Sequence, residues 1–380
     1  MKASLQQPNN PKRQMLLKPL PAPKALNTLM ATAAKTKGED GVIRTLDQLK
    51  AALQTAIELE HSTIPPYLCA LYSIKDGTNQ KAVETIRSVV VEEMLHMILA
   101  CNVLNAIGGE PVINVKNFVP TYPGGLPDSD DSFIINLEKF SKSSVDTFLR
   151  IELPQPTSEP PKYKGYHTIG QFYMAVRIGI EYVNSITPGG IFKDNPEWHK
   201  KQVTEEHYYG SGGQIIPVYD MEAAHQAIDE IVGQGEGIDD TIEDSDQQMF
   251  GQGIEYAHYF RFNEIHEERL YRDTDTPKSG PTGDKIVVEW DAVHNMKLNP
   301  KLADYEAYPE LLEKARAFNR TYTELLDNIH IACNGDPGLL MKSVAQMYKL
   351  KYAATELMNI PIPGTGLMAG PTFEFEPAHK

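Results

Sequence analysis

The sequence has few cysteines and few positive charges for its length, and both shortages exclude classes of protein. Only three cysteines, Cys69, Cys101 and Cys333, occur among 380 residues. Their odd number and wide spacing do not fit a disulfide framework or a zinc ribbon, and a reducing compartment suits them best. Acidic residues outnumber Lys and Arg by 51 to 36, which gives a formal net charge of -15. A nucleic-acid surface needs clustered Lys and Arg, so this balance argues against a nucleic-acid partner.

Long apolar runs and several well-known motifs are also missing. No apolar run approaches the roughly 18 residues of a membrane span, so we expect no membrane partner and a cytoplasmic location. There is no Walker loop, and "GQGIEYA" (251–257) lacks the strand that precedes a dinucleotide fingerprint. The stretch "NEIHEER" (263–269) lacks the second histidine of a zinc-protease helix. With 41% hydrophobic residues, the chain can nevertheless bury a sizeable core.

Helical periodicity is the main pattern that the sequence does contain. One apolar stripe runs over residues 46–73, and Pro65 and Pro66 should kink that helix without ending it. A second helix is predicted from about 81 to 107, before a Gly-Gly pair that can cap its end. The turn at 75–79 is short, so the two helices should form an antiparallel hairpin.

Further helical patterns alternate with segments rich in Pro and Gly. We predict one short strand at 133–140 and helices over about 167–186, 220–237, 247–271, 309–332 and 339–358. Strands are few, so the predicted fold class is all-α. The proline-containing residues 1–40 are typical of a flexible N-terminal arm.

Two Glu-x-x-His pairs stand inside apolar helical patterns. Glu93 and His96 form the first pair, and Glu255 and His258 form the second. A separation of three residues places both side chains on one helical face. One such pair arises often by chance, but two match the carboxylate-bridged dinuclear site of four-helix bundles, in which each of the other two helices adds a lone Glu. Glu92, beside the first pair, is expected to be solvated or to support a ligand.

Each pair therefore requires a lone glutamate on the preceding helix. Glu60 continues the apolar stripe of its helix and lies level with Glu93 across the predicted hairpin. For the second pair, Glu236 continues the apolar row of its helix, while Glu230 and Glu222 are alternatives. The predicted metal ligands are Glu60, Glu93, His96, Glu236, Glu255 and His258. Without cations, burying four carboxylates would be prohibitive in free energy.

Four stretches together resemble the ferritin-like domain of the iminophenyl-pyruvate dimer synthases, which act in violacein- and rebeccamycin-type pathways. They are "AIELEHSTIPPYL" (56–68), "VVVEEMLHM" (89–97), "IVGQGEG" (231–237) and "YAHYFRFNEI" (256–265). The resemblance covers about residues 45–270. It implies a ferritin-like four-helix bundle and the same six ligand positions. It also implies an amino-acid-derived or aromatic substrate.

The predicted organisation has two structured parts after the arm. Residues 41–272 form a ferritin-like dimetal bundle with a long insertion at about 110–218, which would suit a substrate lid. Residues 273–380 form extra C-terminal helices packed on the bundle. Carboxylate and imidazole ligands suit a dinuclear iron site, with manganese as an alternative.

The expected function is that of an oxidoreductase in the biosynthesis of a secondary metabolite. As a dinuclear non-haem metal oxidase or oxygenase, it would act on a small-molecule substrate with dioxygen or peroxide. An iron-storage protein and a non-catalytic ferritin-like binding module are the alternatives, and the long insertions argue against storage. Ferritin-like chains often pair, so a homodimer is considered beside a monomer.

Overall fold

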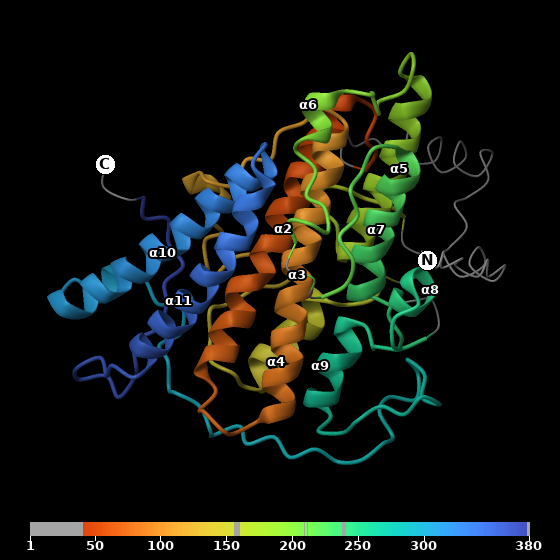
Figure 1. The fold of residues 1–380 in the computed structure, drawn as a ribbon. Coiled ribbons are helices and arrows are strands. Elements are labelled where there is room, and N and C mark those ends of the chain that lie inside the picture. Colours follow the sequence, from red (N-terminus) through yellow and green to blue (C-terminus); the bar gives the residue numbers. More distant parts are fainter. Residues whose placement is uncertain (1–40, 156–159, 209, 211, 238–240, 378–380) are drawn as a thin grey trace, which may run out of the picture.

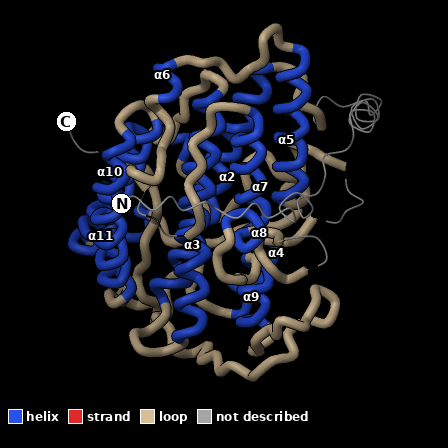
Figure 2. The backbone as a smooth tube through the Cα atoms, turned by 45° about the vertical axis from the view of Figure 1, so that its right-hand side comes forward, coloured by secondary structure: helices blue, strands red, loops and turns tan. Residues whose placement is uncertain are grey.

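The structure is a computed structural model that describes residues 41–155, 160–208, 210, 212–237 and 241–377. The N-terminal arm predicted at 1–40 lies outside the described residues. Within the described part, the chain is helical, with isolated β-bridges but no strand (Figure 2). The all-α prediction is confirmed. The short strand predicted at 133–140 is absent there, since Ile135 alone forms a β-bridge, with Gly124.

Two long helices form one half of the bundle. α2 (Leu46–Ser73) and α3 (Gln80–Ala106) pack against each other as the predicted hairpin (Figure 1). Pro65 and Pro66 lie inside α2, and the helix continues past them to Ser73. By length and composition alone α3 could cross a membrane, but 89% of its apolar window is buried inside the protein. Its hydropathy is therefore explained by its place in the core.

Four shorter helices form the other half, as two broken columns. They are α4 (Lys142–Ile151), α5 (Ile169–Ile186), α7 (Met221–Gly235) and α9 (His258–His266). Helices α4 and α5 form one column, which packs on α2. Helices α7 and α9 form the other column, which packs on α3. In Figure 1, α5 and α7 lie in the upper part of the bundle, and α4 and α9 lie in the lower part. Both columns are interrupted near the middle of the bundle.

Two predictions about the segments that form these columns are wrong. The segment 110–218 was expected to be an insertion, but it contains α4 and α5, which supply a whole column. The helix predicted at 247–271 is divided, because α8 (Asp246–Phe250) ends at Gly251, whose φ of 72° is left-handed. Residues 251–257 are not helical, and α9 begins only at His258.

The remaining helices lie outside the bundle. The short ones are η2 (Lys116–Phe118), α6 (Pro196–His199), η3 (Leu302–Tyr305) and η4 (Pro337–Leu339). α10 (Pro309–Cys333) and α11 (Leu340–Met358) form a second hairpin that packs on α2 and α3 (Figure 1). Asn105, buried on α3, donates a hydrogen bond of 2.7 Å to the carbonyl of Cys333. The C-terminal hairpin is thus fixed on the side of the bundle away from α5 and α7.

Candidate metal centre

Five side chains with metal-binding groups meet where the two columns break. They form two groups, Glu60 with Glu93 and His96, and Glu93 with Glu152 and His258. Within each group the possible ligand atoms all lie within 4.8 Å of one another. All five residues are buried, with at most 4% of any of them exposed. Glu93 belongs to both groups, so the two potential metal positions share a carboxylate.

The helix breaks place two of these residues. Glu152 is the residue that caps the C-terminal end of α4, and His258 is the first residue of α9. Both ends point into the middle of the bundle, opposite Glu60 on α2 and Glu93 on α3. If either column were one continuous helix, only side chains on its inner face could reach the centre. The interruption therefore lets helix ends contribute to the centre.

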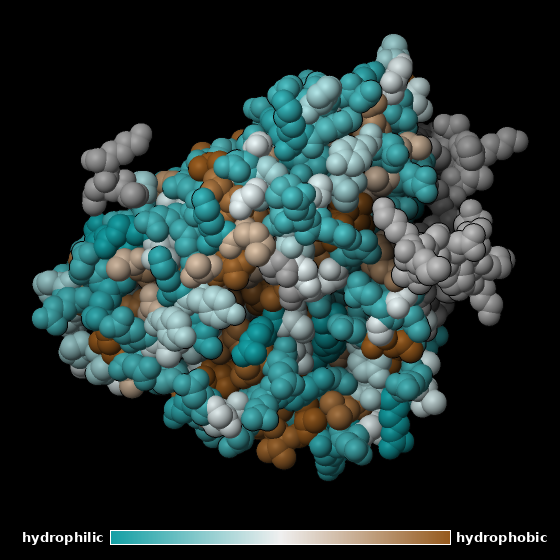
Figure 3. All heavy atoms as spheres, in the orientation of Figure 1, coloured by the Kyte–Doolittle hydropathy of each residue, from teal (hydrophilic) through white to brown (hydrophobic). Residues whose placement is uncertain are grey.

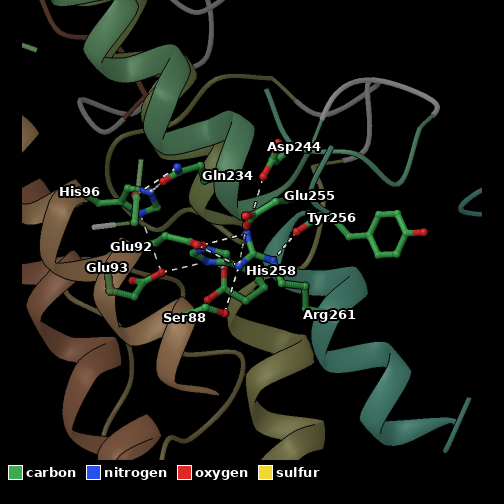
Figure 4. A network of polar contacts seen from close by, with 12 residues as sticks. Ser88, Glu92, Glu93, His96, Gln234, Asp244, Glu255, Tyr256, His258 and Arg261 are labelled. Atoms are coloured by element: carbon green, nitrogen blue, oxygen red, sulfur yellow. Dashed lines mark hydrogen bonds and ion pairs between the residues drawn. The ribbon is translucent and has the colours of Figure 1, made fainter. Parts of the chain in front are cut away.

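The two imidazole rings present the same nitrogen to the carboxylates. His96 Nδ1 lies 3.4 Å from Glu60 Oε2 and 3.8 Å from Glu93 Oε1. His258 Nδ1 lies 3.1 Å from Glu93 Oε1 and 3.4 Å from Glu152 Oε2. The rings are stacked, with centroids 5.6 Å apart. One oxygen of Glu93 thus faces the Nδ1 atoms of both imidazoles (Figure 4).

The carboxylates are held from outside by hydroxyl groups. One oxygen of each accepts a hydrogen bond: Glu60 from Tyr173, Glu93 from Thr63 (2.6 Å) and Glu152 from Tyr67 (2.5 Å). Burial raises the pKa of both tyrosines well above the usual value of 10, so they remain protonated donors. The second oxygen of each carboxylate faces the imidazole nitrogens and remains available to a cation.

The imidazoles are oriented in the same way by acceptors on their outer side. His96 Nε2 lies 2.8 Å from the amide oxygen of Gln234, and His258 Nε2 lies 2.6 Å from Glu92 Oε2. Both partners can only accept, so each Nε2 carries a proton and each Nδ1 is directed at the central carboxylates. This is the orientation found in metal-binding histidines supported by an outer carboxylate or carbonyl. Of the two roles expected for Glu92, it has the supporting one.

Burial makes the central carboxylates difficult to ionise. It raises the pKa of Glu60 to about 8, and together with the nearby charge of Glu152 it raises the pKa of Glu93 to about 7. Burial also lowers the pKa of His96. Carboxyl groups placed in this way favour either a bound proton or a bound cation. The centre is therefore electrostatically suited to positive charge.

Glu92 contrasts with these carboxylates, although it is equally buried. Burial alone would raise its pKa, but the Arg261 guanidinium and His258 outweigh that effect and lower it to about 2. Arg261 lies 2.8 Å from Glu92 Oε2 through Nη2 and donates to Oε1 at 2.9 Å through Nη1 (Figure 4). Glu92 is thus a permanent anion that polarises the imidazole of His258.

The donor set fits a metal pair. His258 Nδ1 is buried, yet within the described part of the chain no group makes a well-aligned hydrogen bond to it. Burial would lower the pKa of His258, but Glu152, Glu92 and Glu93 outweigh burial and raise it well above 6.5. This nitrogen, which faces two buried carboxylate oxygens, therefore favours a bound proton or a bound metal cation. Three carboxylates and two imidazoles offer oxygen and nitrogen ligands and no thiolate, a combination typical of iron or manganese.

Four of the six residues that the sequence analysis selected meet here, and two do not. Glu236 follows α7, and its carboxylate lies against the first turn of α5, where a Cβ on Gly170 would be 2.1 Å from its Oε1. Its Oε2 accepts a hydrogen bond of 3.1 Å from the backbone of Gln155. A carboxylate is stabilised at a helix N-terminus, which explains its direction. Glu236 is in neither group.

Glu255 also lies outside both groups. Its side chain is 59% exposed and lies 3.7 Å from the guanidinium of Arg261 (Figure 4). Because α9 begins at His258, Glu255 and His258 do not share a helical face. The second Glu-x-x-His pair is therefore a pair in sequence only, and its glutamate does not reach the centre.

The two alternatives for the third-helix glutamate have other places. Glu230 is fully buried and accepts a hydrogen bond of 3.2 Å from the amide nitrogen of Gln234. Gln234 also forms a hydrogen bond with His96, so Glu230 is linked to the centre through Gln234. Burial raises its pKa to about 9. Glu222 is exposed in the first turn of α7.

Glu152 was not among the predicted ligands, although it supplies the second lone glutamate of the centre. A signal was available. Ser141 starts α4 with a capping box, and Val145, Phe148 and Ile151 form its buried stripe. Glu152 stands four residues after Phe148 and so continues that stripe by one helical turn.

The fold and the buried Glu and His groups define a helical bundle whose core could hold a metal. The ferritin-like family model matches residues 53–267, more than half of the 380 residues, and the chain belongs to this family. A crystal structure of a ferritin-like protein from Caulobacter vibrioides is similar, with a TM-score of 0.60 and 24% identity. The match covers 87% of this chain and 99% of that chain, and it shows the shared fold. No curated protein matches the sequence.

Proposed function

We propose that this protein is a dinuclear metal oxidase or oxygenase, with iron as the preferred metal and manganese as the alternative. Glu60 and His96 would hold one ion, Glu152 and His258 the other, and Glu93 would bridge them. The observation that supports this most strongly is the membership of Glu93 in both groups. A carboxylate shared by two ligand sets is the arrangement that dinuclear bundles use.

An iron pair supplies one-electron chemistry with dioxygen or peroxide, which amino-acid side chains cannot supply themselves. The residues around it have separate tasks. Glu92 and Gln234 keep both Nδ1 lone pairs directed at the centre. Tyr67 and Tyr173 hold one oxygen of Glu152 and Glu60, and the other oxygen is left to bind. Burial of all five ligands excludes bulk water from the centre, which limits side reactions there.

The substrate that we propose is a small, amino-acid-derived organic molecule. The four stretches that resemble the iminophenyl-pyruvate dimer synthases support this choice, since they include Glu60, Glu93, His96 and His258. The cysteines are free and buried, which is consistent with a cytoplasmic location. A monomer or a homodimer would both leave the centre inside one chain.

The test is metal loading followed by oxygen consumption. Metal-free protein is loaded with ferrous iron without oxygen, and iron per chain is measured after desalting. Oxygen uptake is then followed with and without aromatic 2-imino acids, produced in place from amino acids by an amino-acid oxidase and corrected for that enzyme's own oxygen use. We expect two irons per chain and oxygen uptake that depends on the substrate.

The Glu93→Ala variant serves as the metal-free control, and it should lose both the iron and the activity. Iron binding without substrate-dependent oxygen uptake would contradict the oxidase proposal. Accumulation of many irons per chain would indicate storage instead.

A further inference from the structure

An apolar cavity lies between the α2–α3 pair and the C-terminal hairpin. Its volume is about 60 Å³, and its lining comes from α2, α3, α10 and α11, with contributions from Tyr208 and Phe373. Figure 3 shows apolar side chains gathered in a hollow over this junction. The cavity is therefore on the other side of α2 and α3 from the remaining bundle helices.

The lining offers almost nothing to a polar ligand. Most of it is Leu, Ile and Met, including Met97, Leu326 and Ile329. The main polar pair, His61 and Tyr322, is already satisfied, because His61 Nε2 and the Tyr322 hydroxyl lie 2.5 Å apart. Burial lowers the pKa of His61 to about 3, so its ring is neutral. Water needs two to four polar partners in such a site, and this lining does not supply them.

The size of the cavity limits the apolar molecules that fit. An engineered apolar cavity of about 150 Å³ stays dry and binds benzene or xenon. At about 60 Å³, this cavity is too small for an aromatic ring without rearrangement, but it can hold a diatomic gas or one xenon atom. An organic substrate of the proposed size is excluded for the same reason.

The cavity lies level with the metal centre. His61 follows Glu60 directly in α2, and Met94 and Met97 follow Glu93 and His96 directly in α3. Neighbouring residues of a helix point about 100° apart, so the same helical turns present ligands to one side and cavity walls to the other. Only the α2–α3 layer separates the two.

We propose that this cavity takes up dioxygen and holds it one helix layer from the metal centre. Dioxygen is apolar and small, so an uncharged cavity with an apolar lining concentrates it relative to water. The flexible side chains of Met94 and Met97 can move to let it pass between the helices. The role in oxygen supply rests on the proposed function, whereas the uptake of gas rests only on the cavity.

Xenon is the probe for gas uptake, because it is apolar and easily located by diffraction. Crystals of the full chain are pressurised with xenon, and one site is expected among Met97, Leu326 and Ile329. Ile329→Phe should fill the cavity and abolish the site. Ile331→Phe makes the same change on α10 at a residue that is 45% exposed and outside the lining, so it should keep the site. Leu326→Ala should enlarge the cavity and increase the occupancy.

Oxygen kinetics test the link to the centre. We expect Ile329→Phe to have a several-fold higher KM for oxygen at unchanged kcat and unchanged iron content, and Ile331→Phe to match the wild type. Absence of xenon from the wild-type cavity would overturn the proposal, as would an unchanged KM in a Ile329→Phe variant that has lost the xenon site. If the wild-type protein consumes no oxygen, the proposed function fails, and xenon alone then decides whether the cavity takes up gas.

Discussion

Glu93 Oε1 lies 3.1 Å from Nδ1 of His258, so the middle of α3 meets the first residue of α9 inside the bundle. The column formed by α7 and α9 is interrupted at that level. A continuous helix from α7 into α9 would have placed Glu255 on the same face as His258. The actual break brings a helix end into the core, and Glu152 at the end of α4 completes the arrangement from the other column.

The ligand assignment predicts different effects for two glutamates. Glu152→Ala should lose one of the two bound metal ions, because it removes a carboxylate from the His258 group only. Glu255→Ala should retain both, since its side chain is largely exposed and outside the centre. Metal per chain, measured by elemental analysis after identical loading, distinguishes them. Equal metal content in the two variants would contradict the assignment.

Glu92 is predicted to control metal affinity without binding metal. Glu92→Gln keeps an acceptor for His258 Nε2 but removes the negative charge, so the imidazole becomes a weaker donor. Changes of this kind typically lower metal affinity by roughly 10- to 100-fold. Competition with a chelator of known affinity measures the change.

Glu92→Gln also leaves the buried Arg261 guanidinium without its charged partner, so a control for that effect is needed. In a Glu92→Gln, Arg261→Gln double variant the buried charge is removed with its partner. If the double variant regained wild-type affinity, the effect would come from the unpaired arginine and not from His258.

The hydroxyl donors are predicted to stabilise the protein even without metal. Tyr173→Phe removes the hydrogen bond to Glu60 while keeping the ring, and it should lower the free energy of unfolding by about 1 to 3 kcal/mol. Urea unfolding of the metal-free protein measures this difference. Tyr352→Phe is the matched control, because Tyr352 is 72% exposed and its change should have no measurable effect. Equal stability of the two variants would show that the Tyr173 hydroxyl contributes nothing.

The sequence was sufficient for the helices whose periodicity is strong. It predicted α2, α3 and the C-terminal hairpin because long apolar stripes and end signals agree there. It also selected Glu60, Glu93 and His96, since a polar residue inside such a stripe must face the core. Spacing within one helix is a local property, and these residues lie on single uninterrupted helices.

The errors come from the broken columns, where long-range packing decides. Glu255 was selected because it stands three residues before His258. Helix α9 begins only at His258, so Glu255 is not helical and the spacing does not place the two side chains on one face. Glu152 was missed because α4 is short and follows a segment rich in Pro and Gly. Glu236 was selected from the apolar row of its own helix, yet its carboxylate lies against the first turn of α5, a helix that had been assigned to an insertion. No local sequence pattern predicts which helix ends will lie next to each other in the folded bundle.

The contribution of Glu60 and Glu93 to stability without metal should fall as the pH rises. Glu60 and Glu93 have folded pKa values of about 8 and about 7, above the ordinary value of 4.5. Below that ordinary value both states hold the protons. Between it and the folded values, the unfolded chain releases protons that the folded protein keeps, so the free energy of unfolding decreases. Glu92 changes in the opposite sense, but only between about 2 and its ordinary value.

This prediction is checked by urea unfolding of metal-free protein at about pH 5 and about pH 8. Glu60→Gln should flatten the dependence, because its side chain cannot ionise. Bound metal should reverse the trend, since cations compete with the same protons. An identical pH dependence in wild type and Glu60→Gln would show that the Glu60 carboxylate is ionised and satisfied in some other way.

The most direct test of the central claim is anomalous diffraction at the iron edge from iron-loaded crystals. Two iron peaks are expected, one beside His96 and Glu60 and the other beside His258 and Glu152, with the Glu93 carboxylate between them. A single peak would contradict the account, and so would iron bound by Glu255 or Glu236 in place of Glu152.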